Sequence, residues 1–342
     1  MARRRIDPEA TPPPVATWQQ VIVERVRAGK LVPIVGRRLG DDLAFGGHSA
    51  LPTAYAAYSR SATTRSTLVE MLQFRSVADA SMVDEVALRS DYVDFIKNLL
   101  FDMAEKAGAQ ASARKEVEDR FDELSFAQFC DKFAYPAFDD PDEPFLLLAS
   151  LDLPIYVTTD FHDFLEMALR KAGKRPRSDL CRWRSELKGT PAAFDEPFPD
   201  GRPYDPDPEN PLVYHLFGRD EDPASLVLTE DDHLKFLAAA YQDFGRETDP
   251  IHSRVRRAMS VSSLMLLGYS LEQWDLRALF WSLIVPRSQP TQGVAIQLEP
   301  GETEKGYLER YLQEYKFEVV WDTAQGYLIE LYQHLNARVS GA

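Results

Sequence analysis

Short apolar runs alternate with segments of helical periodicity along most of this chain. Several of the runs end at a glycine, as strands that lead into tight turns often do. Apolar strands separated by helices are typical of a parallel sheet that helices cover on both faces. The pattern therefore predicts an α/β fold. We expect strands at residues 31–35, 154–159, 212–217, 225–228, 263–267, 294–298 and 317–321.

Three stretches depart from this alternation. Residues 45–150 are helical in pattern, with a continuous apolar stripe at 92–103, and predict a helical module inserted after the first strand. Residues 174–211 are rich in proline and predict a long irregular excursion, which is either mobile or a cover over a ligand or a neighbouring chain. Residues 1–15 combine prolines with arginines and are expected to form a flexible arm. We expect residues 16–342 to form a single domain.

The carboxyl ends of the predicted strands carry the special turns of the chain. These turns lie at residues 36–40, at 158–163, at Gly218 and at 268–275. In a parallel sheet such ends lie along one edge, which is where ligands bind. Four special turns at the same edge indicate a ligand site more strongly than any one of them alone.

Composition narrows the classes of function. The formal net charge of −15 repels phosphate backbones, so we do not expect direct contact with nucleic acid. Cys130 and Cys181 are too few for a structural zinc site, and we expect two reduced thiols and no metal. The N-terminus lacks the apolar segment of an export signal, and no apolar stretch reaches the ~20 residues of a membrane helix. These features predict a cytoplasmic protein that does not contact a membrane.

Several stretches, in this order, resemble the sirtuin-like domains of bacterial defence proteins. They are VPIVGRRLG (32–40), TTDFHDFLE (158–166), VYHLFG (213–218), SLVLTEDDHLKFL (225–237), LLGYSLEQWDLRALF (266–280) and YLERYLQEY with FEVVW (307–321). The resemblance covers residues 17–338 and implies a doubly wound, Rossmann-like sheet with an inserted helical module. Many members of this family cleave NAD to nicotinamide and an ADP-ribose product, which depletes the infected cell. The resemblance implies NAD or ADP-ribose as the ligand, and a homo-oligomer or a defence-system sensor subunit as the partner.

The first loop departs from the family's Gly-Ala-Gly. Gly36 remains, but Arg37 and Arg38 replace the small residues that let backbone N–H groups approach a diphosphate. An arginine stem crowds that approach, whereas its guanidinium binds an anion with a different geometry. Both interpretations stay open. The family's protein deacylases carry a four-cysteine zinc ribbon that this chain lacks, which argues against deacylation.

Two further loops differ at residues that the family uses for chemistry. The family's Thr-Thr-Asn, whose asparagine positions the ribose or the attacking water, is Thr158-Thr159-Asp160 here. Phe217 stands where the family has its catalytic histidine, and a phenyl ring cannot accept a proton. The resemblance implies that Thr158 and Thr159 still contact a nucleotide.

Asp160, His162 and His215 offer a substitute acid–base set. His215 lies two residues before Phe217 and therefore on the same strand face, and His162 closely follows Asp160. The alternative is structural, with His215 as a half-buried strand residue and His162 at the start of a helix. A histidine needs a positioned partner before it acts as a catalyst.

Three functions remain, and one of them is an active site for another anionic nucleotide that Arg37 or Arg38 binds. By resemblance, Gly218 ends its strand at the nucleotide, while Gly268, Tyr269, Ser270 and Asp275 line the adenosine half of the ligand. The departures at the three loops favour a nucleotide-site protein with altered or lost catalysis, which acts as a sensor or an assembly module in antiviral defence. The alternative is an active NAD hydrolase that releases nicotinamide.

Overall fold

Seven strands form one parallel sheet within residues 18–60, 67–82, 84–269, 294–298, 305–314 and 317–337, which this computed structural model describes. The strands are β1 (Leu31–Val35), β2 (Ile155–Thr158), β3 (Arg177–Leu180), β4 (Leu212–His215), β5 (Ser263–Leu267), β6 (Val294–Leu298) and β7 (Phe317–Trp321). Their order across the sheet is β3-β4-β2-β1-β5-β6-β7, and each neighbouring pair is parallel. The predicted α/β fold is confirmed.

The direction of winding reverses at β1. After β1 the chain forms β2, β3 and β4 on one side, with β4 between β2 and the edge strand β3, and then returns to β5 on the other side of β1. β1 pairs with β5 from Leu31 opposite Ser263 to Val35 opposite Leu267, and with β2 through Val35 opposite Thr158. Every residue of β1 is buried, as expected for the central strand of a covered sheet. Such a reversal opens a crevice at the carboxyl ends of the two strands.

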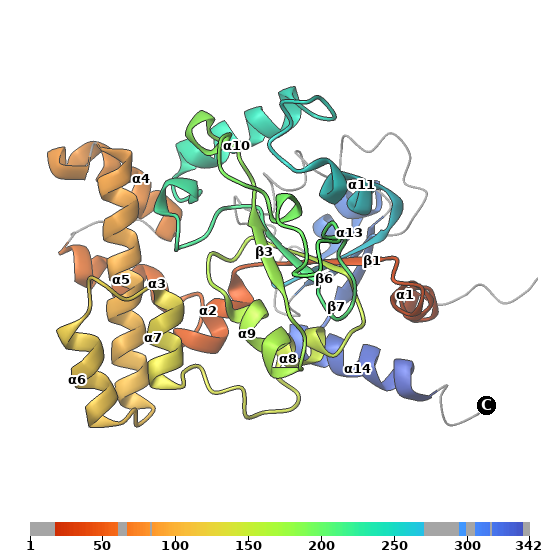
Figure 1. Cartoon of the computed structure of the whole chain (residues 1–342), viewed down its shortest axis with the longest axis horizontal. Helices are drawn as coiled ribbons and strands as arrows, with labels where there is room; N and C mark the ends of the chain where they lie inside the picture. Colours follow the sequence, from red (N-terminus) through yellow and green to blue (C-terminus); the bar gives the residue numbers. More distant parts are fainter. Residues whose placement is uncertain are drawn as a thin grey trace, which may run out of the picture.

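Helices cover both faces of the sheet. Figure 1 shows α8, α9 and α14 below the sheet and α10 and α11 above it. No helix within the described ranges is long and apolar enough to cross a membrane. The helices that pack on or beside the sheet are α1 (Trp18–Arg27), α2 (Arg38–Ala44), α8 (Pro144–Ala149), α9 (Phe164–Lys171), α10 (Glu230–Gln242), α11 (Ser253–Val261), α13 (Lys305–Glu314) and α14 (Ala324–Ala337).

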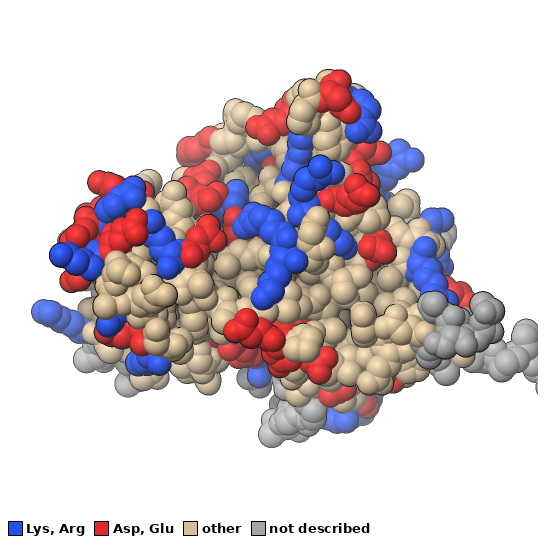
Figure 2. All heavy atoms as spheres, turned by 60° about the horizontal axis from the view of Figure 1, so that its bottom comes forward, with Lys and Arg blue, Asp and Glu red and all other residues tan. Residues whose placement is uncertain are grey.

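A separate group of helices lies beside the sheet, at the left of Figure 1. The ring of Phe126 in this group stacks on His162 with 4.1 Å between ring centroids, and Tyr92 meets Phe161 edge-on. The predicted helical module thus packs against the loop after β2. Figure 2 shows acidic and basic side chains interspersed over the outer surface of this module. Its helices are α3 (Ala50–Ser59), α4 (Leu68–Ala78), α5 (Glu85–Lys106), α6 (Ala111–Asp119) and α7 (Phe126–Phe133).

The proline-rich excursion contains a strand that the apolar pattern did not predict. β3 adds to the edge of the sheet beside β4, and its polar sequence hides it from a search for apolar runs. The segment after β3 is anchored rather than loose, because the guanidinium of Arg177 lies 4.3 Å from the ring centroid of Tyr204. The indole N–H of Trp183 also donates to the Ser225 carbonyl at 2.8 Å.

The strand predicted at residues 225–228 was wrong. A 3₁₀ turn at Pro223–Ser225 occupies its start. The Val227 N–H donates to the Phe217 carbonyl at 2.9 Å, but residues 226–228 join no ladder of the sheet. From the sequence alone, an apolar segment that is buried beneath the first turn of a helix cannot be distinguished from a short buried strand.

Candidate functional site

The loop after β1 packs directly on the end of β5. The Gly36 N–H donates to the Leu267 carbonyl at 2.7 Å, and a Cβ on Gly36 would collide with the Gly268 carbonyl. Gly268 has a φ of +71° and faces Leu39, so a side chain there would be strained and would overlap that leucine. Close approach of the two backbones therefore requires both glycines, and it positions the start of α2 at the crevice between β1 and β5.

Arg37 and Arg38 have different environments. Arg37 is buried, with its guanidinium 5.1 Å from the ring centroid of Phe161 and its Nε 3.5 Å from Asp41 Oδ2. Arg38 is partly exposed, and its Nε lies 3.8 Å from Asp42 Oδ2. The Arg38 Nε atom is buried and has no hydrogen-bond acceptor in the described part of the chain. Arg38, but not Arg37, belongs to the lining of the cavity described next.

This cavity has a volume of about 320 Å³ and lies at the carboxyl edge of the sheet. Arg38 and Gly268 lie on its wall, together with carboxylates from α2 and from the start of α8. Burial raises the pKa of the Glu143 carboxyl, which also caps α8 by accepting the Leu146 N–H at 3.0 Å. The lining residues are Arg38, Leu39, Asp42, Leu43, Asp140, Glu143, Pro144, Gly268, Thr323, Ala324 and Gln325.

The threonine pair after β2 holds the central loops together. The Thr158 hydroxyl donates to the Val35 carbonyl at 3.2 Å and accepts the Asp160 N–H at 2.9 Å. The Thr159 hydroxyl lies 3.2 Å from the hydroxyl of Tyr269, which is also buried. These bonds tie the ends of β1, β2 and β5 to one another.

Asp160 is a buried carboxylate with one unsatisfied oxygen. Its Oδ1 accepts the His162 N–H at 3.2 Å. Its Oδ2 lies against Gly40 and has no hydrogen-bond partner among the described residues. Burial raises the pKa of Asp160 to about 6, although the positive charge of His162 opposes this shift.

His162 is fully enclosed between aromatic rings and a carboxylate. Its Nδ1 lies 2.6 Å from Asp220 Oδ2, and its ring stacks on Phe126. Burial by itself lowers the pKa of His162, but the hydrogen bond and the charge of Asp220 outweigh burial and raise the pKa. His162 is 3% exposed and does not line the cavity.

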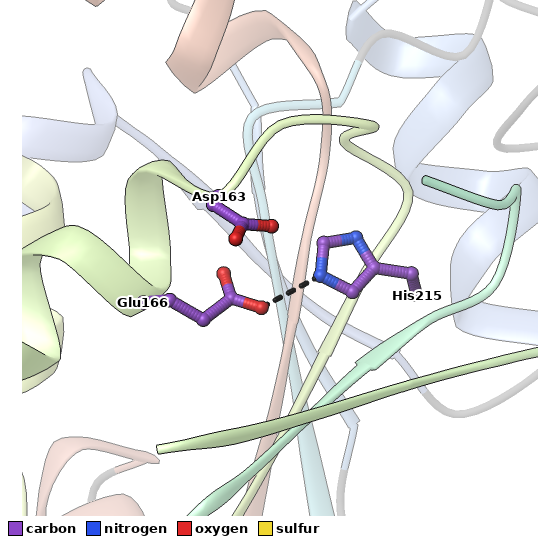
Figure 3. A group of neighbouring side chains, drawn as sticks. All are labelled: Asp163, Glu166 and His215. Carbon is purple, nitrogen blue, oxygen red and sulfur yellow. Dashed lines mark hydrogen bonds and ion pairs between the residues drawn. The ribbon is translucent and has the colours of Figure 1, made fainter. Parts of the chain in front are cut away.

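His215 ends β4 in an equally closed environment. Its Nδ1 lies 2.9 Å from the Asp160 carbonyl oxygen, and its Nε2 lies 2.8 Å from Glu166 Oε1. Figure 3 shows the imidazole facing Glu166, with Asp163 beside them at the start of α9. Burial opposes the charged form of His215, but Glu166 outweighs burial and raises the His215 pKa. Burial likewise opposes the charged form of Glu166, but His215 prevails and lowers the Glu166 pKa.

Phe217 is buried in an apolar contact with the helix that follows. Its ring meets His233 and Phe236 edge-on, with 5.3 Å and 5.1 Å between centroids. Gly218 continues the turn and packs against Ser225. Ser270 and Asp275 lie outside the described residues.

The residues suggested by sequence thus separate into two groups. Arg38 and Gly268 line the cavity, with Gly36 packed directly behind them. Asp160, His162 and His215 form a buried polar network behind the strand ends. Sequence reasoning missed the partners of these histidines. The spacing of acidic residues in the sequence could have identified these partners. Asp163 and Glu166 are one helical turn apart, and Asp220 closely follows the glycine that ends a predicted strand. The missed residues are Asp220 and Glu166, which bond to His162 and His215, and the neighbouring ion pair of Asp163 and Arg219.

Residues 154–320 match the family model of the SIR2-like domain. The match starts just before β2 and ends within β7, so it spans just under half of the chain and leaves out β1 and the helical module. None of the curated proteins matches the chain significantly. The family match supports a sirtuin-like domain over these residues, with an NAD-related function.

Proposed function

We propose that this protein binds NAD or ADP-ribose at the cavity beside Gly268 without cleaving it, and that it acts as a nucleotide sensor or assembly module in antiviral defence. One observation carries the proposal. Asp160, His162 and His215 are all at most 3% exposed, and none of them lines the cavity. A general acid or base must come within hydrogen-bond reach of the proton that it transfers. These three side chains therefore do not meet a ligand in the cavity.

The residues around the cavity suit a nucleotide in two respects. Arg38 lines the cavity and its side chain is 30% exposed, so its guanidinium offers N–H donors to a phosphate oxygen. The carboxylates of Asp42, Asp140 and Glu143 suit ribose hydroxyls, which donate hydrogen bonds to acidic side chains in dinucleotide sites. The volume of about 320 Å³ lies at the lower end of the range for small-molecule sites. The same carboxylates oppose a second phosphate, so Arg38 has to supply most of the attraction.

Calorimetric titration with NAD and with ADP-ribose tests this binding. We expect saturable binding of at least one of them, and a ~10-fold weaker affinity in Arg38→Ala because a charge-assisted hydrogen bond is lost. Arg120→Ala is the matched control, since Arg120 is an exposed arginine that is also paired with a nearby carboxylate. Absence of binding for both nucleotides, or equal affinities in wild type and Arg38→Ala, would refute the proposed site.

The assembly role has its own test. Light scattering after size exclusion gives the mass of the full chain with and without ADP-ribose. We expect the ligand to change the oligomeric state, because an assembly module has to report occupancy through its contacts. A mass that is the same in both conditions would contradict the assembly role and leave nucleotide binding to be judged by the titration.

A further inference from the structure

The proposed function makes no use of the buried group formed by Asp163, Glu166 and His215. Figure 3 shows the carboxylate of Glu166 in α9, the carboxylate of Asp163 just before α9 and the imidazole of His215 in β4 directed toward one another. One ligand-type atom from each residue lies within 4.8 Å of the other two. The group is independent of the nucleotide cavity, because none of the three residues lines it.

The contacts of His215 show which of its two ring nitrogens carries a proton and which can bind a metal ion. Its Nδ1 faces the backbone carbonyl of Asp160, which only accepts, so Nδ1 carries a proton. Nε2 then faces Glu166 Oε1 at 2.8 Å, and that oxygen also accepts from the Ser178 hydroxyl at 2.6 Å. Two lone pairs repel at such a distance, so a proton or a cation must lie between the two atoms. A proton shared by Nε2 and Oε1, or a metal ion bound by both atoms, meets this requirement.

Glu166 provides the second observation. It is wholly buried, and its Oε2 has no hydrogen-bond partner among the residues that the structure describes. Figure 3 shows this oxygen directed toward the carboxylate of Asp163. Arg219 Nη2 lies 2.9 and 3.0 Å from the two oxygens of Asp163, and also 2.9 Å from Glu221 Oε2. One arginine therefore serves two carboxylates, and the Glu166 oxygen is left facing a like charge.

The geometry points to a divalent metal site in which His215 Nε2 and carboxylate oxygens of Asp163 and Glu166 bind one Zn²⁺ or Mn²⁺ ion. One imidazole and two carboxylates match these ions, whereas Mg²⁺ keeps most of its waters and would not enter so closed a site. The ion would relieve the contact between the two carboxylates and replace the proton on Nε2.

The surroundings of the three ligands fit this assignment. Metal bonds of ~2.1 Å place ligand atoms ~3.0–3.4 Å apart, close to the present separation of His215 and Glu166. Metal-bound histidines usually donate their other N–H to a carbonyl or carboxylate, as His215 does to Asp160. Ser178 and Arg219 hold the carboxylates in the same way. His215 and Glu166 are both wholly buried, so a substrate has no path to the ion, and the ion would tie α9 to β4.

Metal analysis of the full-length, tag-free protein tests the site. The protein is treated with chelator, dialysed against Zn²⁺, Mn²⁺ or Mg²⁺, freed of unbound ion and measured by mass spectrometry. We expect about one equivalent of Zn²⁺ or Mn²⁺, none of Mg²⁺, and a rise of about 3 °C in Tm with the bound ion. Asp163→Asn and Glu166→Gln should lower the affinity more than ~100-fold. Asp220→Asn is the matched control, because it disturbs a neighbouring buried Asp–His pair and keeps all three ligands.

Two further readouts decide the question if the ligand variants fold poorly. Co²⁺ loading of the wild type should give visible d–d absorption, and Asp220→Asn should retain the metal despite its lower stability. Less than a tenth of an equivalent of Zn²⁺ and Mn²⁺ in the wild type, or no Co²⁺ absorption, would overturn the assignment. So would unchanged metal content in folded Asp163→Asn and Glu166→Gln.

Discussion

Replacing Asp160 with asparagine should stabilise the protein, and the gain should grow with pH. The carboxylate of Asp160 is buried, and one of its oxygens lies unpartnered against Gly40. Asparagine keeps the oxygen that accepts the His162 N–H and removes the charge from the second position. It also introduces the residue that the resemblance to sirtuin-like domains implies at this position.

The magnitude follows from the pKa of Asp160, which burial raises from 3.8 to about 6. A carboxyl with a raised folded-state pKa holds its proton more tightly in the folded protein, so the wild type loses stability as pH rises through this range. Two pKa units correspond to about 3 kcal/mol in total, of which about 2 kcal/mol falls between pH 4.5 and 7.5. The Asp160→Asn variant has no such proton to lose.

Urea unfolding of both proteins at several pH values, with chelator present, measures the difference. The unfolding free energy of Asp160→Asn minus that of the wild type should increase by about 2 kcal/mol from pH 4.5 to 7.5. Any constant cost of burying an amide cancels in this comparison. A difference that stays flat over the range, or that falls with pH, would refute the assignment of Asp160 as a buried, poorly solvated carboxylate.

Two other substitutions examine the same network. Gly40→Ala places a Cβ in contact with Asp160 Oδ2 and should lower the unfolding free energy by about 1–3 kcal/mol in thermal melts; Gly189→Ala, in open space, is the control and should change it by less than ~0.5 kcal/mol. Equal effects of the two would contradict the close packing of α2 on Asp160. Asp220→Asn should cost about 3 kcal/mol, and more at pH 6 than at pH 8.5, because a raised His162 pKa adds stability below 6.5 that is lost as pH rises. A loss that is larger at the higher pH would show that His162 is not charged in the folded protein.

The alternation of apolar runs and helices predicted most of the sheet because central parallel strands are buried on both faces. β1 and β5 show this directly, since every residue in them is buried. The apolar pattern did not predict β3 because an edge strand needs no continuous apolar run. Its polar residues Arg177 and Asp179 instead form hydrogen bonds with the segment that covers them. The strand predicted at residues 225–228 was wrong because burial alone does not distinguish a strand from an apolar segment that packs beneath the first turn of a helix.

The candidate site was predictable only at the level of loops. Strand ends had to meet at one edge, and Arg38 and Gly268 do line a cavity there. Nothing in the sequence could show that Arg37 packs on Phe161 while its neighbour Arg38 lines the cavity. The partners of His162 and His215 come from segments distant in sequence. Packing of α9 against β4 brings Glu166 to His215, and the meeting of the loops after β2 and β4 brings Asp220 to His162.

An incubation with NAD tests most directly whether the protein leaves the bound nucleotide intact. Wild type, Asp160→Ala, His215→Ala and Phe217→His are each held with NAD at a concentration above its dissociation constant, and nicotinamide is followed by chromatography. We expect no nicotinamide above the protein-free control in any of the four, including Phe217→His, whose new imidazole would be enclosed by His233 and Phe236. Nicotinamide release by the wild type that disappears in Asp160→Ala and His215→Ala would contradict the account and identify an NAD hydrolase.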